Sequence, residues 1–204
     1  MTEKLSPTQK FTNARLNAIQ ALYAAEFNQA PMEQVIFDFL NGKVGSQLLR
    51  ENEKGKEEFI ELPVMDKELF AKIAQEAWSR KPELDEIIVK SVQSGWENDR
   101  IEMLLQSILR AGLAEFFVNP NLDAPIIINE YTDITRSFYE GAEVALVNAV
   151  LNKFAKVIRG WQSLCSSIKR GAVVVPRFLF LNNKKAFAHQ LSGCSCCTPF
   201  FDFE

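Results

Sequence analysis

Apolar residues recur at steps of three and four positions along most of the chain between Phe11 and Ile158. This spacing places them on one face of an α-helix. Pro, Gly and Asn residues interrupt the pattern where helices end. The pattern therefore predicts an all-α bundle whose helices are joined by short turns. The expected helices cover about 8–28, 31–40, 66–95 (kinked or divided at Pro82), 99–118, 125–139 and 143–158.

Two of these helices carry the clearest local signals. Asp66 is a plausible N-cap for the helix that follows it, because its short side chain can accept a hydrogen bond from the first turn. Asn98 or Asp99 is the expected cap of the segment 99–118. That segment has apolar residues on most faces of the helix, so we expect it at the centre of the fold.

The segment 50–62 is crowded with charged residues and contains Gly55. It predicts a solvated loop. We expect no strand in the first 160 residues, because no stretch there shows a convincing alternation of apolar and polar side chains.

The last 44 residues differ in kind from the rest. Helical spacing ends near Ile158, so we expect a helical domain over 1–160 and an extension over 161–204 outside its core. All four cysteines lie in this extension, together with the single histidine: Cys165, Cys194, Cys196, Cys197 and His189. Zinc is a possibility for four of these side chains, His189, Cys194, Cys196 and Cys197, but the usual paired C-x2-C spacing is missing. We therefore expect no metal and no other cofactor.

Charge and motif content narrow the function. The 204 residues carry a net charge of −3, and residues 1–160 hold 18 basic and 24 acidic residues. An acidic body is not typical of a strong stand-alone nucleic-acid binder. Phosphate-binding and hydrolase motifs are lacking, and the only histidine lies in the extension, which argues against an enzyme. A polar N-terminus, no long apolar run and a cysteine-free body indicate a cytoplasmic protein.

Three segments of the chain carry recognisable motifs. Residues 14–23 have the sequence ARLNAIQALY, and residues 108–116 have the sequence ILRAGLAEF. The third segment combines DAP at 123–125, INE at 128–130 and LVNAVL at 146–151. In order and spacing over about residues 8–159, these segments resemble the NusB family, the first its opening helix and the second its central helix.

This resemblance implies two small antiparallel helical subdomains packed as one unit. It also implies a transcription antitermination factor that pairs with NusE, binds boxA-type single-stranded RNA and joins an RNA polymerase complex. The chain departs from the family where Phe11, Thr12 and Asn13 replace a run of arginines, and where Leu146 replaces an aromatic residue. Fewer phosphate and stacking contacts lower RNA affinity. We therefore expect RNA binding mainly as a heterodimer with NusE.

The resemblance and the nearby basic residues assign candidate sites. The expected RNA contacts are Lys4, Lys10, Arg15 and Asn148, and the expected partner contacts are Tyr23, Asn129 and Glu130. Three of them have a structural alternative. Arg15 can be an ordinary surface arginine, Tyr23 a packed side chain, and Asn148 a buried amide that ties helices together.

Two other functions stay open at this point. A helical protein-interaction scaffold without RNA binding would also explain the acidic body and the missing arginines. A detached NusB-like domain of a ribosomal RNA cytosine methyltransferase is the other alternative. A homodimer also stays open.

Overall fold

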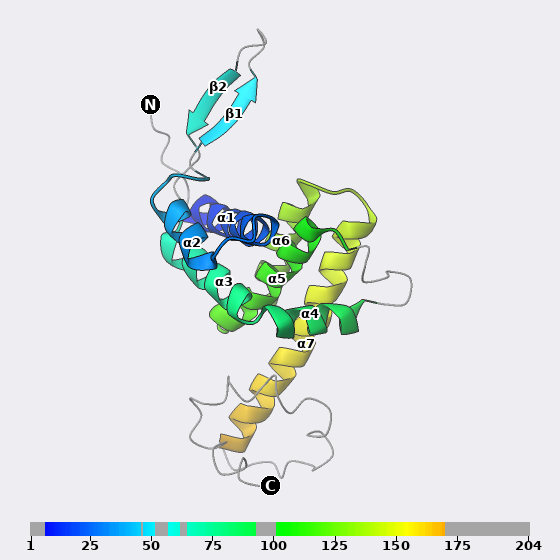
Figure 1. Ribbon diagram of the computed structural model, residues 1–204. Helices are drawn as coiled ribbons and strands as arrows, with labels where there is room; N and C mark the ends of the chain where they lie inside the picture. The colour runs from blue at the N-terminus through cyan, green and yellow to red at the C-terminus, as the bar shows by residue number, and fades with distance from the viewer. Residues whose placement is uncertain (1–6, 46, 52–56, 62–64, 93–100, 170–204) are drawn as a thin grey trace. The chain divides into compact units, whose positions relative to one another are not determined.

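A computed structural model describes residues 7–45, 47–51, 57–61, 65–92 and 101–169 (Figure 1). These residues form seven α-helices and one β-hairpin. The elements are α1 (Pro7–Phe27), α2 (Met32–Leu40), β1 (Gln47–Glu51), β2 (Glu57–Glu61), α3 (Lys67–Ser79), α4 (Lys81–Ser91), α5 (Met103–Val118), α6 (Ala124–Arg136) and α7 (Ala142–Lys169). The prediction of an all-α bundle is confirmed for the helical body.

The chain divides into two compact units, Met1–Ala155 and Lys156–Glu204. Residues 170–204 lie outside the described residues, and so do Cys194, Cys196, Cys197 and His189. The predicted domain boundary at residue 160 therefore stays a prediction. The packing described below belongs to the first unit.

Helix α5 lies at the centre of the first unit, as its sequence predicts. Eleven of its 16 residues are buried, which requires neighbours on nearly every side. It packs against α1, α3, α4 and α6, and Figure 1 shows it between them. Phe116 also meets Phe154 of α7 edge to face, with ring centroids 5.7 Å apart.

Helix α1 joins this centre through a stripe of small residues. Ala14, Ala18, Ala21 and Ala25 are fully buried, and α1 packs against α2, α3 and α5. Short side chains allow the backbones of neighbouring helices to approach closely. Helix α3 begins where the sequence predicts, because Oδ1 of Asp66 accepts a hydrogen bond from the backbone N–H of Leu69 at 2.8 Å.

The predicted loop at 50–62 is wrong for the residues of this segment that the structure describes, 50–51 and 57–61, and so is the expectation of no strand in the first 160 residues. Strands β1 and β2 pair antiparallel (Figure 1), with Leu48 opposite Ile60 and Leu49 opposite Phe59 in the register. The many charged residues of the segment obscured the strand pattern in the sequence.

Some helix boundaries also differ from the prediction. Helix α5 is capped by Glu102 and begins at Met103, so neither Asn98 nor Asp99 is its cap. Helix α6 ends at Arg136, three residues before the predicted Tyr139. Helix α7 runs to Lys169 rather than to Ile158.

Gly112 allows α5 to approach two neighbouring helices at once. A Cβ atom at this position would lie 3.0 Å from Cδ2 of Leu151 on α7 and 3.3 Å from Cγ of Tyr131 on α6. Both neighbours are completely buried. A larger side chain therefore has no open space to occupy.

We expect Gly112→Val to destabilise the protein by about 2 kcal/mol, because overpacking of a tight core costs roughly 1–3 kcal/mol. Ala149→Val is the matched control, since Ala149 is exposed on α7 and the change costs only the helix propensity of valine, about 0.6 kcal/mol. Urea unfolding of both variants measures the difference. Equal stabilities would contradict the close packing at Gly112.

Candidate functional site

A buried arginine connects three helices of the first unit. Arg15 of α1 is 5% exposed, and its Nε and Nη2 donate to the two carboxylate oxygens of Glu115 on α5 at 2.8 and 2.6 Å. Its Nη1 donates to Oε2 of Glu130 on α6 at 3.1 Å. Thr12, one turn before Arg15, donates to the same oxygen of Glu130 at 2.8 Å. The two-pronged contact with Glu115 matches the planar geometry of a guanidinium and a carboxylate.

The charge states of this cluster are fixed by burial and by mutual contact. Burial alone lowers the pKa of Arg15, but the hydrogen bond and the charge of Glu115 outweigh it and leave the pKa above its usual value. Glu115 itself is fully buried. Burial, followed by the negative charge of Glu115, holds the pKa of Tyr131 well above its usual value, so the phenol keeps its proton.

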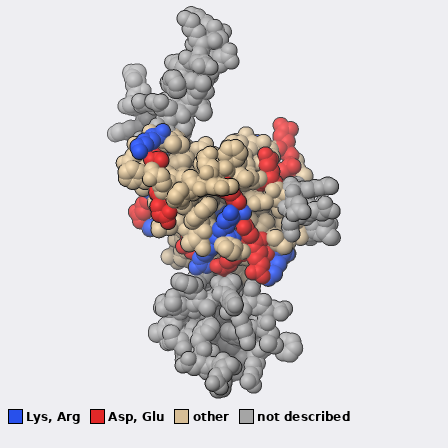
Figure 2. Space-filling view, viewed as in Figure 1, with Lys and Arg blue, Asp and Glu red and all other residues tan. Residues whose placement is uncertain are grey.

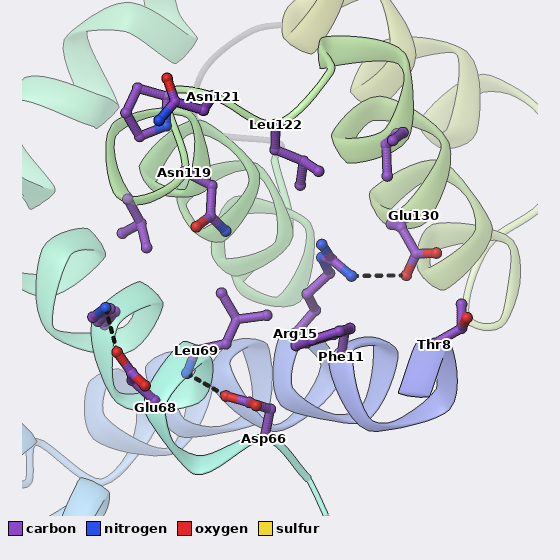
Figure 3. Close-up of a pocket in the computed structure, with 14 residues that line it drawn as sticks. Thr8, Phe11, Arg15, Asp66, Glu68, Leu69, Asn119, Asn121, Leu122 and Glu130 are labelled. Carbon is purple, nitrogen blue, oxygen red and sulfur yellow. Dashed lines mark hydrogen bonds and ion pairs between the residues drawn. The ribbon is translucent and has the colours of Figure 1, made fainter. Parts of the chain in front are cut away.

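The same cluster borders a groove of about 690 Å³ (Figure 3). Figure 3 shows Arg15 reaching from α1 toward Glu130, with Leu69 and Asp66 of α3 on the other side. The chain from the end of α5 to the start of α6 completes the rim. The lining residues are Thr8, Phe11, Arg15, Asp66, Glu68, Leu69, Lys72, Val118, Asn119, Pro120, Asn121, Leu122, Ile126 and Glu130.

The structure describes three of the four predicted RNA contacts, which differ in exposure. Lys10 is exposed near the start of α1, and its carbonyl accepts a hydrogen bond from the backbone N–H of Asp66 at 3.1 Å. Arg15 is buried, so the alternative of a surface arginine is wrong, while its contact with RNA stays a prediction. Asn148 is exposed and accepts a hydrogen bond from Asn152 at 2.9 Å, so the alternative of a buried tie between helices is wrong. Lys4 lies outside the described residues.

The predicted partner contacts lie on two helices, Tyr23 on α1 and Asn129 and Glu130 on α6. Tyr23 is half-buried near the end of α1 and stacks on Phe27, with ring centroids 5.7 Å apart. Asn129 is exposed on α6. Glu130 is half-buried and is the only one of the three that lines the groove. The structure thus brings together Arg15 and Glu130 among the residues that the sequence singles out.

Sequence reasoning missed a second charged cluster at the other end of α1. Arg110 of α5 is 4% exposed and donates from Nε and Nη2 to the carboxylate of Asp85 on α4, at 2.6 and 3.1 Å. It also pairs with Glu26 of α1, which Lys81 contacts at 2.9 Å. Burial acts to raise the pKa of Glu26, but Lys81 and Arg110 together lower it below its usual value. Arg110 is thus buried and joins α5 to α4 and α1.

The described surface has no broad field of one charge on the face that Figure 2 displays, where lysine and arginine side chains lie beside aspartate and glutamate. Several ion pairs of the described residues form within one helix, such as Lys72 with Glu68 at 2.6 Å. Among the described residues, no group of three metal-ligating side chains is found, and no helix has the length and apolarity to cross a bilayer.

Comparison with known proteins identifies relatives of one kind. A family model described as the NusB family matches residues 12–156. The chain is 37% identical over 153 residues to the transcription antitermination protein NusB of Rhodospirillum rubrum, covering 72% of this chain and 83% of that protein. It is 32% identical over 146 residues to the protein of the same name from Caulobacter vibrioides, covering 72% and 92%. A crystal structure of NusB and NusE in complex with double-stranded RNA has a similar fold, with a TM-score of 0.55, 18% identity and coverage of 74% of this chain and 99% of that chain.

We expect Arg15→Met to destabilise the protein by about 3–5 kcal/mol, because it leaves the buried carboxylate of Glu115 without its cation. Arg136→Met is the matched control. It breaks the pair of Arg136 with Asp133, whose side chains are 61% and 68% exposed, and such a pair contributes less than about 1 kcal/mol. Urea unfolding measures both.

A second substitution identifies the cause. Adding Glu115→Gln to Arg15→Met removes the unpaired charge and should recover part of the lost stability. If Arg15→Met is no more costly than Arg136→Met, the buried pair does not hold α1 to α5.

Proposed function

Because the chain belongs to the NusB family, we propose that it is a transcription antitermination factor that binds boxA-type single-stranded RNA together with NusE. The observation that carries this proposal is the match of the family over residues 12–156, with relatives that bear the name transcription antitermination protein NusB. The fold it shares with a NusB that was crystallised with NusE and RNA supports the choice of partners. The RNA polymerase antitermination complex is the assembly in which the pair would act, in the cytoplasm.

The surface supports RNA binding that depends on the partner. Charges of both signs alternate on the displayed face, so long-range attraction of a phosphate backbone is weak (Figure 2). We propose Lys4, Lys10 and Asn148 as the direct RNA contacts of this chain. Arg15 would act on RNA indirectly by holding α1, which carries Lys10, against α5. The role is one of binding and assembly, without catalysis.

A scaffold that binds proteins but no RNA is the second candidate. Its support is specific to this chain: Phe11, Thr12 and Asn13 stand where the family has arginines, and the cation that does follow, Arg15, is buried in ion pairs. RNA titration of the chain with and without NusE distinguishes the two. The detached methyltransferase domain is less favoured, because the relatives found carry the antitermination name and match over 83–92% of their own length.

We expect Lys10→Ala to weaken RNA binding by the complex of this chain with NusE, and to reduce the salt dependence of that binding by about 0.7 in the log–log slope, the contribution of one phosphate contact to a single strand. Lys90→Ala is the matched control, since Lys90 is an exposed lysine of α4 that pairs with Glu86 of its own helix. Titration of labelled boxA RNA at several salt concentrations gives both slopes.

Equal slopes for the two lysine variants would remove Lys10 from the RNA surface. The absence of RNA binding by the wild-type complex would favour the scaffold instead.

A further inference from the structure

Among the described residues, strands β1 and β2 form a sheet of two strands only. Each strand therefore pairs along one edge, and no other described strand lies along its second edge. The substantial contacts of each strand are with the other strand. A two-stranded hairpin without a third strand or a packed helix is only marginally stable in water. An edge of this kind is a template for pairing with another extended segment.

The register of the hairpin gathers negative charge on one face. Residues two apart along a strand share a face, and so do residues directly opposite each other. This acidic face consists of Gln47, Leu49, Glu51, Glu57, Phe59 and Glu61. Glu51 stands opposite Glu57 in the register, and like charges in directly opposed positions destabilise a strand pair. A cation placed beside β2 on this face would offset the repulsion.

The remaining positions define what fits beside β2. Leu49 and Phe59 are opposed at the middle of the acidic face, between the pairs that contain glutamate. On the other face, Arg50 stands opposite Glu58, so a complementary charge already occupies the position across the hairpin. The pattern presented along β2 on the acidic face is therefore glutamate, phenylalanine, glutamate. Its complement is a cation, an apolar residue and a second cation at alternate positions of an added strand.

Charge decides against two other occupants of this edge. A second copy of β2 would place glutamate opposite glutamate in either direction, because Glu57 and Glu61 lie at its two ends. A nucleic acid would bring phosphates to a face whose sequence contains three carboxylates and no cation. A basic protein segment turns the same charges into attraction.

We propose that the outer edge of β2 accepts an extended basic segment of a partner protein as a third strand. The segment places a cation opposite Glu57, an apolar residue opposite Phe59 and a cation opposite Glu61. Main-chain hydrogen bonds supply affinity, and the alternate residues supply specificity, as in other cases of strand addition. The inference goes beyond the proposed function, because it concerns the hairpin and requires neither NusE nor RNA.

Three labelled, end-capped peptides test the proposal on the full-length chain. The peptide TKTVTKT has the complementary pattern in both directions. The peptide TKPPTKT keeps both lysines but lacks two adjacent backbone N–H groups, one of which would face β2 in any register. The peptide TETVTET reverses the charge. Fluorescence anisotropy at low and at high salt measures binding, and slowed amide hydrogen exchange of residues 57–61 locates it.

One double variant of the chain tests the edge itself. Glu57→Lys combined with Glu61→Lys reverses the charge along β2 and should not weaken the hairpin, because it places a cation opposite Glu51. The matched control is Glu33→Lys combined with Glu140→Lys, which makes the same change in net charge at two exposed positions outside the hairpin.

We expect the wild-type chain to bind TKTVTKT more tightly than TKPPTKT, and to bind TETVTET least. The variant of β2 should bind TKTVTKT about tenfold more weakly, since each of two cross-strand pairs contributes about threefold in affinity. The control variant should stay within about twofold of wild type. The difference between the two variants should shrink as salt is added.

Four results would overturn the proposal. Equal binding of TKTVTKT and TKPPTKT would show attraction by charge alone, without an added strand. Equal binding by the two double variants would exclude the edge of β2. If the wild-type chain binds none of the peptides, the glutamates serve only to prevent copies of the hairpin from pairing. A change in boxA RNA binding confined to the variant of β2 would assign the edge to nucleic acid. None of these results contradicts the proposed function, which NusE and RNA binding by the wild-type chain tests separately.

Discussion

The ion pair between Arg15 and Glu115 is the contact on which the arrangement of α1 and α5 depends. Glu115 is fully buried, so its negative charge has to be compensated within the protein. The buried guanidinium of Arg15 does this with two hydrogen bonds. A second cluster repeats the arrangement with the signs exchanged, since Glu26 of α1 pairs with Arg110 of α5. The two pairs require α1 and α5 to run antiparallel. A parallel arrangement would bring arginine to arginine and glutamate to glutamate in the interior. Burying charge in this way contributes specificity of packing more than it contributes net stability.

Most of the helical fold could be predicted because it follows from local spacing. Three local patterns, each within one or two helical turns, predict a helix face, a helix start and a buried helix. They are the alanine stripe of α1, the cap at Asp66 and the apolar residues on all sides of α5. The hairpin could not be predicted in the same way. Its strands consist largely of charged residues, and the apolar pairs that match across it, Leu48 with Ile60 and Leu49 with Phe59, are apparent only once the register is known. The start of α5 was misplaced because Asn98 and Asp99 are better capping residues than Glu102, which forms the actual cap without a side-chain hydrogen bond.

For the candidate site, the sequence indicates the residues but not their contacts. Its residues could be named from the sequence, since Arg15, Glu115 and Glu130 all fall in the segments that resemble the NusB family. Their relation could not be predicted, because they come together over separations of 100 and 115 residues. An amphipathic helix is interpreted by placing apolar residues inside and charged residues outside. That rule puts Arg15 on the surface, where a phosphate contact is a natural role. The rule fails for a charge that is paired in the interior, and nothing in α1 alone distinguishes the two cases.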